Sequence, residues 1–138
     1  MYLRPIIIAI TLINLAGCII QTDKQRQADQ IINQFHTALQ TQQWDQAANL
    51  FDAKFFKSQS RAAWQNEIEQ AQHMLGKIES YAISSKSKDP RFSGDFYIYT
   101  VTVQHEHGFS TETITIVRSL DSDSLAIVGY QIKSRRNQ

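Results

Sequence analysis

The sequence predicts a single α+β domain in which helices cover one face of a twisted antiparallel sheet. The chain has 138 residues, which is enough for one hydrophobic core. Apolar residues recur at helical spacing as far as residue 75, and from residue 77 onward the chain is rich in alternating β-branched residues. Because the helical segments come first and consecutive strands follow, the expected fold class is α+β, with three helices and about four strands.

Composition excludes several classes of protein. The chain is 42% hydrophobic, 20% charged and 10% aromatic, which is too apolar for a disordered protein. The formal net charge of +1 predicts no nucleic-acid partner. A single cysteine, Cys18, excludes an internal disulfide framework and a Cys-based zinc site. Phosphate-loop and nucleophile-elbow motifs are absent from the sequence, and we expect no cofactor.

The first residues are typical of an export signal. A short polar start that carries Arg4 precedes ten nearly all-apolar residues, from Ile6 to Leu15. A helix needs about 20 apolar residues to span a bilayer, so this run fits the core of a signal peptide better than a permanent anchor.

The motif Leu15-Ala16-Gly17-Cys18 resembles the bacterial lipoprotein signal, in which small residues precede a cysteine. The resemblance implies cleavage before Cys18, a diacylglycerol on its thiol and acylation of the new amine. An ordinary secretory signal with a coincidental cysteine is the alternative. Because Ile19 and Ile20 follow, resemblance to enterobacterial sorting rules implies the outer membrane, facing the periplasm. The expected divisions are a signal peptide at 1–17, a lipidated N-terminus and tether at 18–27, a domain at 28–134 and a tail at 135–138.

Three helices are expected before the sheet. The first runs from about Thr22 to Gln42, capped by Thr22 or Asp23 and Gln-rich on its solvated face. The second covers Trp44 to Phe51, and the third begins at Ser58 or Ser60 and ends at Gly76, which suits a left-handed cap. Their apolar stripes contain Ala28, Ile31, Ile32, Phe35, Ala38 and Leu39; Trp44, Ala47, Ala48 and Phe51; and Trp64, Ile68, Ala71 and Leu75.

Four strands follow, separated by turn residues. A polar loop from Ser84 to Asp95, with Pro90 and Gly94, is expected after the first strand, and Glu106-His107-Gly108 marks a hairpin. From Ser134 the chain is expected to end in a frayed basic tail, a solvated end or a contact for anionic lipid. The expected strands are Ile78–Ser85, Phe96–His105, Phe109–Ser119 and Leu125–Lys133.

The second of these strands is apolar on both faces. Phe96 and Ile98 alternate with Tyr97, Tyr99, Val101 and Val103. A strand with one wet face alternates more cleanly, so either the sheet curls around a cavity or its second face meets another chain. A homodimer through that outer face is one of the expectations.

The order of these features resembles the NTF2-like superfamily, a curved antiparallel sheet wrapped around three helices to form a cone. The resemblance is carried by the long first helix, by Trp44-Asp45-Gln46-Ala47-Ala48 and by Phe51 with Phe55-Phe56. A closer likeness is to a family of uncharacterised bacterial secreted and lipoprotein domains, although the usual Trp of their last strand is absent. That likeness spans about Asp23 to Ser134 and lies in Trp64, Leu75-Gly76-Lys77, Glu112-Thr113-Ile114-Thr115 and Gly129-Tyr130-Gln131-Ile132.

The resemblance also supplies candidate pocket residues. NTF2-like isomerases and dehydratases place Asp, His and Tyr inside the cone, where a base and an oxyanion donor face one dry pocket. The corresponding residue types here are His36, Asp52, Tyr97, Tyr99 and Tyr130. The simpler interpretations are a structural role for His36 and a helix-end turn for Asp52. For the tyrosines, the simpler interpretation is aromatic packing with their hydroxyls at the rim. We assign no catalytic residue.

The segment His105-Glu106-His107 has spacing that would bring two imidazoles to one face of a strand. No third ligand is evident beside this hairpin, and we expect no metal site.

These observations predict a lipid-anchored periplasmic protein, held to the membrane through Cys18. We expect a binding or scaffolding domain, rather than an enzyme, for a partner protein or a small apolar ligand of the cell envelope. The alternative is an NTF2-like enzyme of the isomerase or dehydratase type that acts on a small hydrophobic substrate.

Overall fold

A computed structural model describes residues 22–91, 93–119 and 124–137. The predicted signal peptide, Cys18 and the residues as far as 21 lie outside this part of the chain. Among the described residues, no helix combines the length and the apolar character needed to cross a bilayer. The elements are α1 (Asp23–Gln40), α2 (Trp44–Ala48), α3 (Phe55–Ser58), α4 (Arg61–Leu75), β1 (Ile78–Arg91), β2 (Gly94–His105), β3 (Gly108–Ser119) and β4 (Leu125–Arg136).

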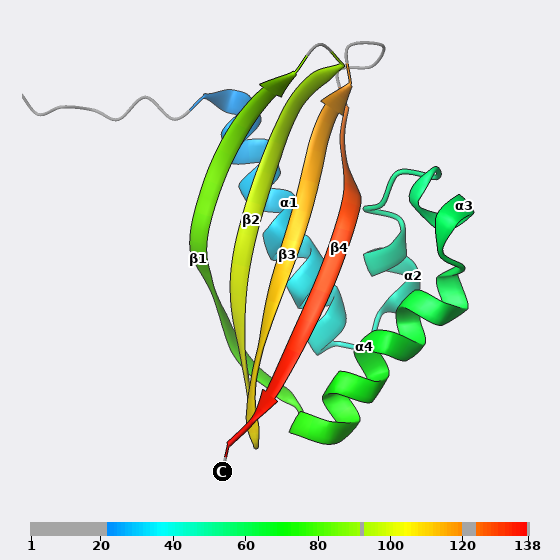
Figure 1. Cartoon of the computed structure of the whole chain (residues 1–138), viewed down its shortest axis with the longest axis vertical. Helices are drawn as coiled ribbons and strands as arrows, with labels where there is room; N and C mark the ends of the chain where they lie inside the picture. Colours follow the sequence, from blue (N-terminus) through cyan, green and yellow to red (C-terminus); the bar gives the residue numbers. More distant parts are fainter. Residues whose placement is uncertain (1–21, 92, 120–123, 138) are drawn as a thin grey trace, which may run out of the picture.

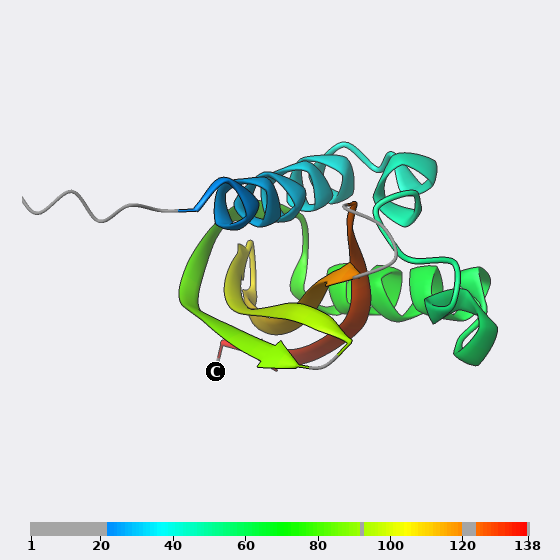
Figure 2. The same cartoon turned by 90° about the horizontal axis from the view of Figure 1, so that it is seen from above.

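The four strands form one open, curved sheet in the order β1-β2-β3-β4, with every neighbouring pair antiparallel. Helix α1 lies across the concave side of this sheet, and α4 lies beside β4 (Figures 1 and 2). The predicted α+β class and the antiparallel sheet are confirmed. The helix count is wrong, because the described chain has four helices, and α4 lies in the middle of the chain rather than at its N-terminus.

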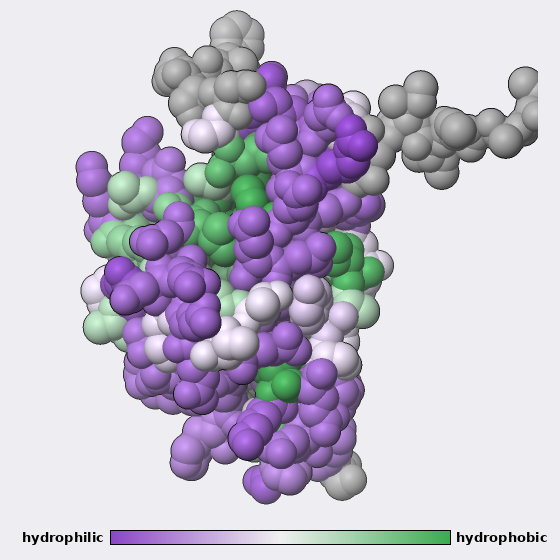
Figure 3. Space-filling view, turned by 180° about the vertical axis from the view of Figure 1, so that it is seen from behind, coloured by the Kyte–Doolittle hydropathy of each residue, from purple (hydrophilic) through white to green (hydrophobic). Residues whose placement is uncertain are grey.

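Helix α1 begins where the sequence predicts. The hydroxyl of Thr22 accepts a hydrogen bond from the backbone N–H of Gln25 at 3.3 Å and so satisfies one of the free donors of the first turn. The residues of its apolar stripe are buried, apart from the partly buried Ile31. Seen from behind, with α1 in front of the sheet, the molecule is mostly hydrophilic (Figure 3). The Gln-rich face is therefore a solvated surface, as predicted.

The second and third helices are divided differently from the expectation. Helix α2 ends at Ala48 rather than at Phe51, and a separate short helix, α3, follows it. Helix α4 begins after Ser60, whose hydroxyl accepts from the N–H of Ala63 at 3.1 Å. It ends at Gly76, where φ is +84°, a backbone angle that favours glycine.

The first and last strands are longer than predicted. Strand β1 continues through the expected polar loop to Arg91 and includes Pro90. Because β1 is an edge strand, proline is tolerated there without the loss of an internal ladder hydrogen bond. The predicted frayed tail is also wrong, since Arg135 and Arg136 belong to β4 and pair with the first residues of β3.

The core lies between α1, α4 and the concave face of the sheet, and aromatic side chains fill its centre. The ring of Phe35 on α1 lies 5.7 Å from that of Phe51 and 5.5 Å from that of Tyr130 on β4. Trp64 on α4 lies 5.1 Å from Phe51 and is fully buried. Burial of so much aromatic surface supplies much of the hydrophobic stabilisation of the domain.

Candidate functional site

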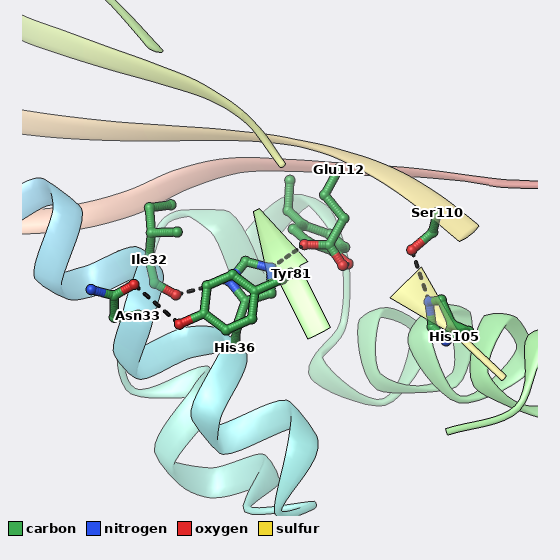
Figure 4. A network of polar contacts seen from close by, with 8 residues as sticks. Ile32, Asn33, His36, Tyr81, His105, Ser110 and Glu112 are labelled. Carbon is green, nitrogen blue, oxygen red and sulfur yellow. Dashed lines mark hydrogen bonds and ion pairs between the residues drawn. The ribbon is translucent and has the colours of Figure 1, made fainter. Parts of the chain in front are cut away.

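A buried histidine and a buried glutamate join α1 to the sheet. His36 Nε2 lies 2.8 Å from Glu112 Oε2 on β3, and the side chains are 0% and 2% exposed (Figure 4). His36 Nδ1 lies 2.8 Å from the carbonyl oxygen of Ile32, one turn earlier in α1. The two residues are 76 positions apart in the sequence, so this is a long-range contact.

The partners of His36 determine where its protons are. A carbonyl oxygen only accepts, so Nδ1 carries a hydrogen and donates it to Ile32. The short contact between Nε2 and the Glu112 carboxyl then requires one shared proton, held as an imidazolium–carboxylate pair or as a neutral imidazole beside a carboxylic acid. Either way, both ring nitrogens of His36 are engaged by the protein.

Two tyrosines complete this network. The hydroxyl of Tyr130 donates to the other carboxyl oxygen of Glu112 at 3.0 Å, and burial together with that carboxylate raises the pKa of Tyr130 above its usual value. The ring of Tyr81 stacks on the imidazole of His36 with 4.4 Å between centroids. Its hydroxyl donates to Asn33 at 3.1 Å, which ties β1 to the same helix (Figure 4).

Tyr99 belongs to a second cluster near the start of α1. Its hydroxyl donates to Asp29 Oδ1 at 2.7 Å and accepts from the Gln25 amide at 2.7 Å. Lys86 on β1 lies 3.2 Å from the other oxygen of Asp29. Burial, followed by the hydrogen bond to Asp29, raises the pKa of Tyr99 above its usual value.

The structure therefore unites only part of the predicted pocket. His36 and Tyr130 both bond to Glu112. Tyr99 bonds to Asp29 instead, and Tyr97 is buried. Asp52 lies in a turn, where it accepts a hydrogen bond from the backbone N–H of Lys54 at 2.8 Å. Asp52 thus has the helix-end role that the sequence favours. The prediction that tyrosine hydroxyls lie at the rim is wrong for Tyr130, whose hydroxyl is bonded in the interior.

Sequence reasoning missed Glu112, although a signal for it exists. In the strand pattern of β3, Glu112 alternates onto the same face as Ile114 and Ile116. A carboxylate in line with two buried isoleucines requires a buried partner, and the histidine on the apolar edge of α1 is that partner.

The paired histidines of the hairpin do not act together. Strand β2 ends at His105, so His107 lies in the turn and the two imidazoles do not alternate along one strand. Both ring nitrogens of His105 are hydrogen-bonded within the protein. Nδ1 bonds to the carbonyl of Gly76 and Nε2 to the hydroxyl of Ser110, each at 3.0 Å. Across the described ranges, no three His, Cys, Asp or Glu side chains gather closely enough to hold a metal ion.

A hollow of about 430 Å³, which we call the α3 cleft, lies between α3 and the end of the sheet. Phe96 and Val117 are register partners on the sheet face opposite to the buried Tyr97 and Ile116. The α3 cleft is lined by the apolar residues Phe55, Phe96, Val117 and Val128 and by the polar residues Asp52, Lys54, Ser58 and Ser93.

Local backbone structure explains how the α3 cleft is built. Val128 is skipped in the ladder between β3 and β4, since Thr115 pairs with Gly129 and Ile116 with Ile127. Such a bulge turns a side chain out of the regular alternation. The backbone before α3 is fastened to the same strand, because Ile127 N donates to Leu50 O at 2.9 Å and Asp52 N donates to Ile127 O at 2.8 Å. The sequence predicted none of these contacts.

Comparison with known proteins adds a likeness of fold. No protein-family model matches the chain, and no curated protein matches it. The chain is similar in structure to Bd1075 of Bdellovibrio bacteriovorus, with a TM-score of 0.54 and 15% sequence identity. The match covers 84% of this chain but 42% of that protein, so this chain spans less than half of its length. At this identity, the likeness shows the fold alone.

The raised pKa values of Tyr99 and Tyr130 predict a loss of stability in alkali. Both folded pKa values lie above the ordinary value of 10.0, so their stabilising effect is complete below that pH and falls as the pH rises above it. Each tyrosine is expected to remove about 1.4 kcal/mol of unfolding free energy per pH unit there. Urea unfolding of the wild type, Tyr99→Phe and Tyr130→Phe across this pH range measures the effect. Each variant should show a shallower fall, and slopes equal to the wild type would contradict the assignment.

Proposed function

We propose that this chain is a lipid-anchored protein of the cell envelope that binds a small apolar ligand in the α3 cleft. The observation that carries the proposal is the cleft itself. Four apolar side chains from α3 and three strands converge there, with polar residues beside them. Its volume of about 430 Å³ is within the range of small-molecule sites, about 300–1,000 Å³.

The chemistry of the α3 cleft favours a small molecule with an apolar body and a polar end. Phe55, Phe96 and Val117 offer apolar surface, while Lys54 and Ser58 can meet a polar group of the ligand. The segment that carries Phe55 is held in place by its backbone bonds to β4 and by the contact of Phe55 with Phe51, whose ring centroids are 4.7 Å apart. A cleft whose walls are already fixed lowers the cost of ordering side chains on binding.

The NTF2-like cone is the fold family that we propose for this domain. The long first helix, the short helices after it and the curved antiparallel sheet support that assignment. In this proposal, the interior of the cone is a core rather than an active site. A general base needs a free lone pair that a substrate can reach, and His36 is fully buried with both nitrogens engaged. This geometry does not favour the isomerase or dehydratase alternative.

Apart from the end beside α3, the sheet face opposite to α1 has no helix over it (Figure 2). Binding of an envelope partner protein, or of a second copy of this chain, to that face stays a prediction. The presence of the α3 cleft favours a small ligand over these partners.

The proposed anchor is the acylated Cys18, which implies an outer-membrane location facing the periplasm. Three residues, 19–21, would separate the acylated Cys18 from the Thr22 cap of α1. Fully extended, the four steps from Cys18 to Thr22 reach about 14 Å, so the start of α1 would stay near the bilayer surface. Each buried CH₂ contributes about 0.8 kcal/mol, and two or more chains give stable anchoring.

Replacement of the thiol tests the anchor. In the native host, Cys18→Ser should release the protein from the detergent phase of a Triton X-114 extraction, because no diacylglycerol can be attached. The matched control, Gln21→Ser, keeps the thiol and should partition as the wild type does. Detergent-phase partitioning of Cys18→Ser equal to that of the wild type would refute lipidation at this residue.

Binding of an apolar fluorophore tests the α3 cleft. N-phenyl-1-naphthylamine should bind the wild type with a Kd of about 1–100 µM and be displaced by laurate, because both offer an apolar body of suitable size. Val128→Lys places a charge in the cleft and should weaken binding at least tenfold. The matched control Ile83→Lys changes an exposed isoleucine on β1 and should not. Absence of binding to the wild type, or equal binding to Val128→Lys, would sink the proposal.

A further inference from the structure

A second recessed surface lies at the other end of α1, where α1 ends and α2 begins. It consists of two hollows of about 390 Å³ and 610 Å³, and Gln42 and Trp44 line both. The smaller hollow extends along the last turns of α4 to the β2–β3 turn, and the larger one extends along α2. We call this surface the Trp44 crevice. It shares no residue with the α3 cleft.

The indole of Trp44 is an aromatic surface in this crevice that is held in place by packing. It is partly buried and meets the ring of Trp64 edge to face, with 6.2 Å between centroids and 86° between planes. Because Trp64 is fully buried among core residues, it holds Trp44 in place while the exposed part of that indole borders the two hollows. A held aromatic ring binds a flat apolar surface with little further loss of side-chain freedom.

Half of the ten polar side chains around Trp44 are amides, and the other half are ionisable: Asp45, Glu69, His73, Lys77 and Glu106. An amide side chain both donates and accepts hydrogen bonds, which is also what a hydroxyl group does. Five glutamines line the two hollows, contributed by the α1–α2 connection, α2 and α4: Gln42, Gln43, Gln46, Gln65 and Gln72.

The acidic residues of the crevice already have partners on the protein. Asp45 pairs with Arg61, and Glu69 accepts from the amide of Gln65 at 2.8 Å. Glu106 accepts from the backbone N–H of Lys77 at 2.8 Å. The lining contains three carboxylates and a single lysine, Lys77, so its negative charge also disfavours a phosphorylated ligand. The crevice is therefore suited to an uncharged ligand that is rich in hydroxyl groups.

Gln42 supplies an independent indication. It follows the C-cap of α1 in a Schellman arrangement, in which Gln42 N donates to Leu39 O at 3.2 Å and Gln43 N donates to Ala38 O at 2.8 Å. Its φ is +55°, and it is the one non-glycine residue with positive φ among those described. Glycine or asparagine would hold this conformation with less strain. Backbone strain of this kind is found at functional sites, and here the strained residue presents its amide to both hollows.

We propose that the Trp44 crevice binds a neutral oligosaccharide. The apolar face of a sugar ring would stack on the indole of Trp44, while Gln42 and Gln72 would exchange hydrogen bonds with its hydroxyl groups. The site is well placed for a glycan beyond the membrane surface. The 18 residues of α1 span about 27 Å, so the crevice and the Thr22 cap lie at opposite ends of the helix (Figure 1). That position relative to a membrane rests on the proposed anchor at Cys18, whereas sugar binding in the crevice requires neither the anchor nor the α3 cleft.

Quenching of tryptophan fluorescence tests this site directly. The chain has two tryptophans, and Trp64 is fully buried, so quenching by acrylamide reports mainly on Trp44. The full-length lipidated protein is held in lauryldimethylamine oxide, a detergent with no sugar headgroup. Maltotriose, cellotriose and tri-N-acetylchitotriose are the probes. At least one should protect Trp44 from acrylamide in a saturable way, with a Kd of about 0.1–1 mM.

Variants assign the binding to the crevice, with calorimetry as the readout because it does not need the indole. Trp44→Ala should weaken binding at least tenfold. Since that change also removes packing on Trp64, Gln42→Gly and Gln72→Ala provide milder tests. Each should bind three- to tenfold more weakly, with no fall in the unfolding midpoint. The matched control Gln30→Ala lies on the exposed face of α1 and should bind as the wild type does.

Two results would overturn the proposal. One is the absence of protection and of calorimetric heat with all three trisaccharides at about 20 mM, well above the expected Kd. The other is a wild-type affinity in both folded glutamine variants, which would place the sugar elsewhere on the protein.

Discussion

The pairing of His36 with Glu112 is the constraint on which the rest of the domain depends. Two ionisable side chains lie in the core within 2.8 Å of each other, one from α1 and one from β3. A charge left alone at this depth costs several kcal/mol, which is comparable to the whole stability of a small domain, about 5–15 kcal/mol. A hydrogen bond is directional, so a displacement of α1 along the sheet would weaken this 2.8 Å contact. It therefore sets the position of the helix across the sheet.

The same pairing determines where ligands can and cannot bind. With His36 and Glu112 satisfied by each other, and with Phe35, Phe51 and Trp64 filling the space around them, the concave side of the sheet is a closed core. The two surfaces that we propose for binding lie at its margins. One is the α3 cleft beside the bulge at Val128, and the other is the Trp44 crevice at the end of α1. We therefore interpret the buried network as structural, and we propose that ligands bind in the two hollows at the margins of the domain.

Much of the architecture could be predicted because it depends on local patterns. Helical spacing located α1 and α4, and alternation located the four strands. Gly76 marked the end of α4, and Ser60 was one of the two serines expected at its start. The errors arose where tertiary context overrides local preference. Pro90 predicts a loop but lies in β1. Proline is tolerated there because an edge strand leaves one side of its backbone unpaired. Helices α2 and α3 are separate because Leu50 and Asp52, which lie between them, bond through their backbone to Ile127 of β4, a contact that sequence spacing does not contain.

The candidate site was less predictable, for a related reason. His36 was identified from its place beside the apolar stripe, but its partner lies 76 residues away, and a single sequence carries no record of that pairing. Glu112 could have been found from its alternation with Ile114 and Ile116. The bulge at Val128 and the positive φ of Gln42 could not, because these backbone conformations depend on the folded structure.

A double-mutant cycle on this pair tests the account most directly. It compares urea unfolding of residues 18–138 in a Cys18→Ser background with that of His36→Leu, Glu112→Leu and the double variant. Each single change strands one polar group in the core and should cost about 3–5 kcal/mol, while the double variant should cost less than the sum by at least about 2 kcal/mol. Additive losses of less than about 1 kcal/mol each would mean that the domain does not depend on this contact.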